Sequence, residues 1–134
     1  FPKAFPLAVE VRNEEWFADQ QIFEDYCEML IKNNATNIIV DTAGRRDMLH
    51  MRLTNDTAFI RYVGANHASD YDRLDEWIGR LKEWRSAGLG KLYFFIHQNV
   101  ELESPLLATY FIKKLNEAFD MDLRYPDKNI QTLF

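Results

Sequence analysis

The stretch Leu7-Ala8-Val9-Glu10-Val11-Arg12 indicates the fold most directly, because it is a short apolar run that contains two charges of opposite sign. In a β-strand, side chains two residues apart point to the same face of the sheet. Glu10 and Arg12 are therefore expected to lie side by side, within reach of an ion pair. Polar side chains near the end of a buried strand are typical of the sheet edge at which parallel α/β proteins bind ligands.

The rest of the chain predicts strands that alternate with helices. Runs of β-branched and aromatic residues predict further strands over residues 37–41, 57–64 and 91–96. Apolar residues at helical spacing predict helices over residues 19–33 and 70–87, and a last helix that begins at Ser104-Pro105. This order predicts an α/β fold with a parallel sheet of about four main strands.

The predicted helix ends carry recognisable signals. Asn33-Asn34 should stop the first helix, since Asn tolerates the left-handed conformation of a helix C-terminus. Ser69 can cap the start of the second helix, and Gly88 suits its exit. Pro105 is favoured at the first position of a helix, so Ser104-Pro105 predicts the start of the last one.

Composition limits the function classes. A chain of 134 residues is predicted to form a single domain with a substantial core. The net charge of -5 and the scattered Lys and Arg argue against a nucleic-acid-binding face. The apolar runs are too short to cross a membrane. Cys27 is the single cysteine, which excludes an internal disulfide and predicts a reducing, cytoplasmic location; within a helical pattern it is expected to be buried.

Charged residues in or after the predicted strands are the candidate site. Glu10 is either one partner of a structural ion pair or a general acid or base beside a cation. Asp41 ends the second strand and could hold a proton or a metal, or cap the next loop. Arg61 lies within the third strand, where it either faces a pocket or pairs with Glu10 or Asp41.

Further candidates for ligand binding lie near the same strand ends. His97 and Asn99 follow the fourth strand and offer hydrogen-bonding groups, and Trp16 could line the mouth of the site. No spacing of His, Cys or acidic residues matches a zinc motif, so no metal is predicted, and no cofactor can be named.

Taken in order, several motifs resemble the YecE-like family, also called domain of unknown function 72. These are Ala8-Val9-Glu10-Val11-Arg12 with Trp16-Phe17, Val40-Asp41-Thr42, Ala58-Phe59-Ile60-Arg61-Tyr62-Val63-Gly64, the pair Trp77 and Trp84, and Leu92-Tyr93-Phe94-Phe95-Ile96. The resemblance implies a TIM-barrel-like fold with no established activity, of which this chain would be the carboxy-terminal half. It also implies that Glu10, Arg12, Asp41 and Arg61 occupy the family's recurring polar positions at the barrel mouth.

Two functions of different class follow. In the first, the protein is an enzyme in which Glu10 or Asp41 transfers a proton, while Arg12 and Arg61 hold an anionic small molecule such as a sugar phosphate or carboxylate. In the second, the same residues form the recognition set of a non-catalytic ligand-binding or regulatory protein. Because half a barrel would leave an apolar face and two sheet edges uncovered, a homodimer is also predicted.

Overall fold

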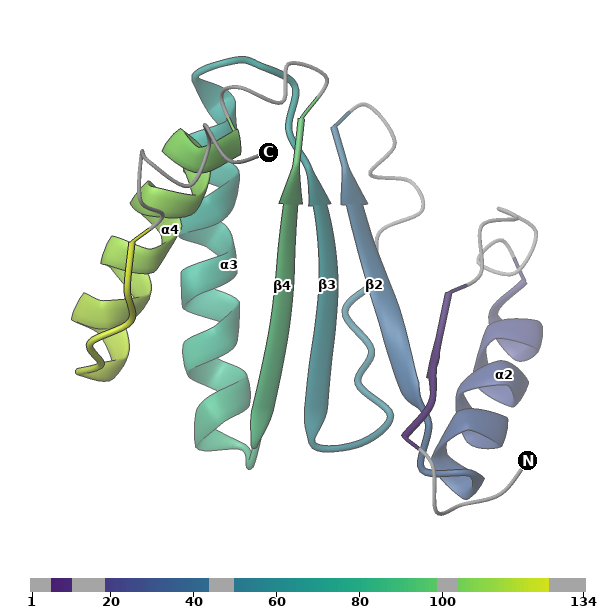
Figure 1. Ribbon diagram of the computed structural model, residues 1–134. Coiled ribbons are helices and arrows are strands. Elements are labelled where there is room, and N and C mark those ends of the chain that lie inside the picture. Colours follow the sequence, from purple (N-terminus) through teal and green to yellow (C-terminus); the bar gives the residue numbers. More distant parts are fainter. Residues whose placement is uncertain (1–5, 11–18, 44–49, 99–103, 126–134) are drawn as a thin grey trace. The chain divides into compact units, whose positions relative to one another are not determined.

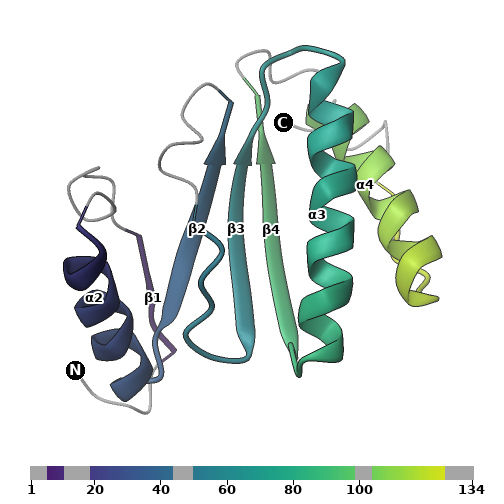
Figure 2. The same ribbon diagram turned by 180° about the vertical axis from the view of Figure 1, so that it is seen from behind.

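The computed structural model describes residues 6–10, 19–43, 50–98 and 104–125 (Figure 1). Its strands and helices are, in chain order, β1 (Ala8–Val9), α2 (Gln20–Lys32), β2 (Thr36–Thr42), β3 (Thr57–Val63), α3 (Ser69–Ser86), β4 (Lys91–His97) and α4 (Ser104–Phe119). The four strands form one sheet in the order β1-β2-β3-β4, which the view from behind shows clearly (Figure 2). The predicted α/β fold with parallel strands is confirmed.

The described residues belong to two compact units. The first contains the described residues up to Val63 together with Gly88–Phe95, and the second contains Gly64–Ala87 and the described residues from Ile96 onward. The first unit therefore holds β1, α2, β2, β3 and most of β4, and the second holds α3 and α4.

The two faces of the sheet in the first unit differ in burial. On β2 and β3, Ile39 lies opposite Ile60 and both are fully buried, as are Ala58 and Tyr62. The residues between them are only partly buried. We call this second surface the open face and define it by Ile38, Val40, Phe59, Arg61, Tyr93 and Phe95.

Three aromatic rings lie close together on the open face. The ring of Phe59 lies 5.8 Å from that of Tyr93 and 5.2 Å from that of Phe95, measured between centroids. Tyr93 and Phe95 are nevertheless 48% and 53% exposed. These two aromatic side chains of β4 are therefore partly solvated.

Helix α2 packs on the buried side of the first unit. Asp19 caps the helix, since its side chain accepts hydrogen bonds from the backbone N–H groups of Gln21 and Ile22 at 2.9 and 3.2 Å. The helix ends as predicted, with Asn34 in the left-handed region at φ 50°. The thiol of Cys27 is fully buried, as expected, and burial raises its pKa.

The described part of the connection between β2 and β3 runs without a helix and is anchored by hydrogen bonds. Arg52 makes a two-point ion pair with Glu24 of α2, at 2.8 and 3.0 Å. Thr54 donates its hydroxyl hydrogen bond to the carbonyl of Ala35 at 2.6 Å. These contacts tie the connection to α2 and to the start of β2.

In the second unit, α3 and α4 pack against each other. The buried positions of α3 include Leu74, Trp77 and Leu81, and the ring of Trp84 meets that of Trp77 edge-on at 6.0 Å. Gly88 follows α3 at φ +115°, the exit that the sequence predicted.

The cap predicted for α3 at Ser69 is wrong. The N-cap residue is Ala68, which has no side chain able to cap, and Ser69 is already the first helical residue. The imidazole Nδ1 of His67 instead accepts the backbone N–H of Ser69 at 3.1 Å. Among the described residues, no helix has the length and apolar content needed to span a membrane.

Candidate functional site

An ion pair between Glu10 and Arg61 is the most informative polar contact of the first unit. Glu10 comes directly after β1, and Arg61 is the fifth residue of β3. Nη1 of Arg61 donates a hydrogen bond of 2.7 Å to Oε1 of Glu10. Sequence reasoning offered Glu10 as one of two partners for Arg61, and the structure selects it.

Strand register explains how the two side chains meet. Arg61 lies opposite Val40 of β2, and Val9 lies opposite Asn37, which puts Glu10 level with Ile38. β1 and β3 are both neighbours of β2, so their backbones are about 10 Å apart. Only long side chains on one face can bridge that distance, so the ion pair crosses β2 on the open face.

The pair is unequally exposed to solvent. The side chain of Arg61 is 42% exposed and that of Glu10 only 13%. The Glu10 side chain is thus mostly shielded, while the Arg61 side chain is partly exposed to solvent. A guanidinium carries five N–H donors in a planar fork that matches carboxylate and phosphate oxygens. The arrangement can bind an anion at Arg61 while Glu10 holds the guanidinium in place.

Asp41 does not join this pair. Asp41 lies opposite Tyr62 in the register of β2 and β3, whereas Arg61 lies opposite Val40. Since alternate residues of a strand point to opposite faces, Asp41 projects to the buried side of the sheet. It is fully buried there. The expected convergence of Glu10, Asp41 and Arg61 at a common rim is therefore not found.

Tyr26 of α2 is a buried residue near Glu10, and the sequence did not identify it as part of the site. Its hydroxyl is within hydrogen-bond distance of the carbonyl of Val9 at 3.3 Å and of Oδ1 of Asn37 at 3.1 Å. Burial raises the pKa of Tyr26 to about 12, with smaller contributions from Cys27 and Glu10. The phenol therefore stays protonated and acts as a structural donor. Its place in an apolar helical stripe gives no signal of this contact.

The remaining predicted site residues are placed as follows. His97 is exposed at the end of β4 and belongs to the second unit. Arg12, Trp16 and Asn99 lie outside the described residues. Within the described ranges, no group of three or more His, Cys, Asp or Glu side chains is arranged to hold a metal ion.

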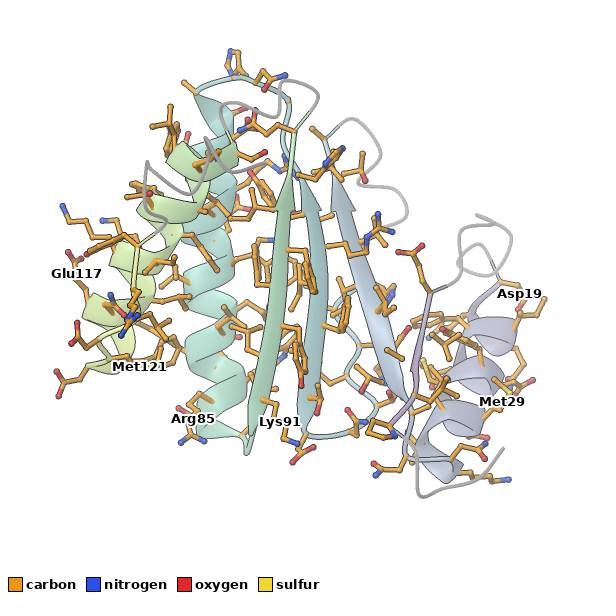
Figure 3. All side chains as sticks on the ribbon, in the orientation of Figure 1. Asp19, Met29, Arg85, Lys91, Glu117 and Met121 are labelled. Carbon is orange, nitrogen blue, oxygen red and sulfur yellow. The ribbon has the colours of Figure 1, made fainter. Side chains whose placement is uncertain are left out.

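A cavity of about 470 Å³ lies at the amino ends of the strands. Its walls include Ala8, Thr36, Thr57 and Lys91, the first residues of the four strands. Figure 3 shows Lys91 at this amino end of β4. In parallel α/β folds ligand sites form at the carboxyl ends, and the amino ends mainly contribute stability. We therefore place the candidate site at Glu10 and Arg61.

Parallel strands alternating with helices, with a charged pair toward their carboxyl ends, define an α/β protein of the barrel-forming or doubly wound kind. The family model described as "Protein of unknown function DUF72" matches residues 1–130. The chain belongs to the DUF72 family, which confirms the resemblance seen in the sequence.

Solved structures agree with this assignment. A crystal structure of a DUF72 family protein from Enterococcus faecalis V583, at 3.10 Å resolution, is 17% identical and has a TM-score of 0.59, covering 92% of this chain and 50% of that chain. Another, at 2.52 Å, is 14% identical with a TM-score of 0.61, covering 87% and 49%. At these identities the likeness establishes the fold alone. The chain spans about half the length of the solved structures it matches.

Comparison with curated proteins adds no activity, since none of them matches this chain. The fold is consistent with half of a TIM-barrel-like protein.

Proposed function

We propose that this protein binds an anionic small molecule, of the sugar phosphate or carboxylate class, at the Glu10–Arg61 pair and acts on it by acid–base chemistry. The single observation that supports this is the 2.7 Å ion pair on the open face, with the Arg61 side chain partly exposed and the Glu10 side chain mostly shielded. Fold alone does not imply an activity, so the proposal rests on this local geometry.

Arg61 and Glu10 would have different roles in this function. Arg61 would bind the anion through charge-assisted hydrogen bonds, which are roughly twice as strong as neutral ones. Glu10 would act as a general base that accepts a substrate proton. Isomerisation and hydrolysis both use such a step.

A second pair on the same chain provides a matched control. Arg52 also makes an ion pair with a glutamate, Glu24, and its side chain is likewise 42% exposed. That pair joins the β2–β3 connection to α2 and does not belong to the open face. A general attraction of anions to arginine would make Arg52 and Arg61 equivalent, whereas the proposed site requires Arg61 alone.

The binding test titrates the chain with inorganic phosphate, citrate and glucose 6-phosphate by calorimetry. Loss of a hydrogen bond to a charged group costs about 1.5–3 kcal/mol, so Arg61→Met should weaken binding about tenfold or more. Arg52→Met should leave it unchanged. Equal affinity in the two variants, or no binding by the parent chain, would rule out the anion site.

Turnover is tested separately with Glu10→Gln. This variant removes the base but keeps the shape of the side chain, so it should retain anion binding and lose any conversion of a phosphoester or sugar phosphate. Conversion that persists in Glu10→Gln removes Glu10 from the mechanism. Binding without conversion by the parent chain favours the alternative of a non-catalytic ligand-binding protein.

A further inference from the structure

The second unit contains a smaller cavity at the start of α3. It has a volume of about 210 Å³, and its walls include Asn66, His67, Tyr71 and Gln98, together with Leu107 of α4. Cavities for drug-sized ligands usually measure about 300–1,000 Å³. A ligand of this cavity would therefore be small.

Gln98, whose side-chain oxygen is unsatisfied among the described residues, lines this cavity. Gln98 follows β4 and is only 2% exposed. Its Oε1 is buried and has no hydrogen-bond partner among the described residues. A buried polar atom without a partner costs about 1–3 kcal/mol, so native proteins rarely retain one without a reason. Oε1 of Gln98 therefore lacks a hydrogen bond that a donor entering the cavity would supply.

The position of Gln98 is closely constrained by its neighbours. A Cβ atom added at Gly64 would lie 3.0 Å from Cγ of Gln98 and 3.0 Å from Oδ2 of Asp70. The side chain of Gln98 therefore packs directly over the backbone of Gly64. The amide is held in the wall of the cavity instead of rotating into solvent.

Asp70 fixes a neighbouring part of the wall. Its buried carboxylate accepts the backbone N–H of Ala65 at 2.8 Å and that of His67 at 3.2 Å. Arg73 approaches the same carboxylate at 3.5 Å. The loop that leads into α3 is thus built around a buried negative charge, and Asp70 itself lines the cavity.

His67 adds a donor to the same cavity. Its Nδ1 accepts the backbone N–H of Ser69 at 3.1 Å, so the proton of the neutral ring belongs on Nε2. The walls thus combine an acceptor at Gln98, a donor at His67, and apolar surface from Tyr71 and Leu107. A hydroxyl group can both donate and accept, and it suits such a mixed lining.

We propose that this cavity binds a small neutral polyhydroxylated molecule, such as a single sugar or polyol, with a ligand hydroxyl donating to Oε1 of Gln98. An anion is disfavoured, because it offers only acceptors, whereas Oε1 of Gln98 needs a hydrogen-bond donor. The site does not depend on the Glu10–Arg61 proposal, since all of its residues belong to the second unit.

The test is a titration of the chain with glycerol, myo-inositol and glucose, monitored by the NMR signals of the Gln98 side-chain amide. These signals are assigned by their loss in Gln98→Leu. We expect a saturable shift with at least one polyol and none with inorganic phosphate. Gln98→Leu should weaken binding about fivefold or more, because one buried hydrogen bond is lost. Gln20→Leu, the same exchange at an exposed position of α2, should bind as the parent does.

Three outcomes would overturn the proposal. The first is the absence of a saturable shift with any of the polyols. The second is unchanged polyol affinity in Gln98→Leu. The third is a shift of the Gln98 amide with phosphate and not with the polyols. The first and third outcomes are measured on the parent chain, so they do not depend on whether a variant folds. The melting temperature of Gln98→Leu should equal or exceed that of the parent, because an unsatisfied buried group is removed.

Discussion

Nη1 of Arg61 lies 2.7 Å from Oε1 of Glu10, although the two residues are 51 positions apart in the chain. Their side chains cross β2, so the contact exists only when β1, β2 and β3 are in their native register. The pair therefore reports on the assembly of the sheet as well as on the candidate site.

A double-mutant cycle of Glu10→Gln and Arg61→Met should give a coupling free energy of about 1 kcal/mol, because one partner is mostly shielded from solvent. Urea-induced unfolding of the parent, both single variants and the double variant measures it. The same cycle at Glu24 and Arg52, where both side chains are more than one third exposed, should give a smaller value. Coupling near zero at Glu10 and Arg61 would show that the pair is not formed in solution.

Stability should depend on the protonation of His50. Burial lowers the pKa of His50 to about 4 from 6.5, and its ring lies 5.2 Å from that of Phe23. The unfolded chain therefore binds a proton between about pH 6.5 and pH 4 that the folded chain does not bind. The free energy of unfolding should be unaffected by this group above pH 6.5 and should fall by about 3 kcal/mol as the pH drops to 4.

Urea unfolding measured at intervals from pH 7.5 to pH 5 tests this dependence, since few carboxylates titrate in that range. His50→Gln should flatten the curve. A parent curve that is already flat between pH 6.5 and 5 would contradict the burial of His50.

Two glycine substitutions should act in opposite directions. Gly64→Ala places a Cβ 3.0 Å from both Asp70 and Gln98, and should destabilise the protein by about 1–3 kcal/mol. Gly79→Ala lies within α3 with no atom within 4 Å of the added Cβ, and should stabilise it by about 1 kcal/mol. Thermal unfolding of both variants measures the difference. A neutral Gly64→Ala would show that Gln98 does not pack over Gly64.

The open face is expected to drive self-association, and a homodimer remains our prediction. Tyr93 and Phe95 expose about half of their surface beside Phe59, and adjoining exposed aromatic residues commonly mark an interaction surface. Light scattering at tens of micromolar should detect a dimer, and Phe95→Glu should yield a monomer. Ile31→Glu, at an equally exposed apolar residue of α2, should remain dimeric. A monomeric parent would rule out this prediction.

Local sequence patterns were sufficient to locate most of the elements. The apolar stripes of α2 and α3, the β-branched run of β2 and the Ser104-Pro105 start of α4 all lie within a residue or two of their predicted positions. These features depend on neighbours three or four residues away in a helix and two away in a strand, so they can be read without the fold. The cap of α3 could not, because Ser69 was predicted to provide it, whereas the helix already begins at Ser69 and its N-cap residue is Ala68.

The sequence by itself determined the parallel α/β order, the family, and the charged residues that lie toward the strand ends. Only the tertiary structure decided that Arg61 pairs with Glu10 and that Asp41 projects to the buried face. It also decided that Oε1 of Gln98 is buried in a cavity wall with no hydrogen-bond partner in the part of the chain that the structure describes. The physical reason is that alternation along one strand sets which residues share a face of that strand. The register between strands, and what packs on each face, depend on contacts between residues that are far apart in the chain.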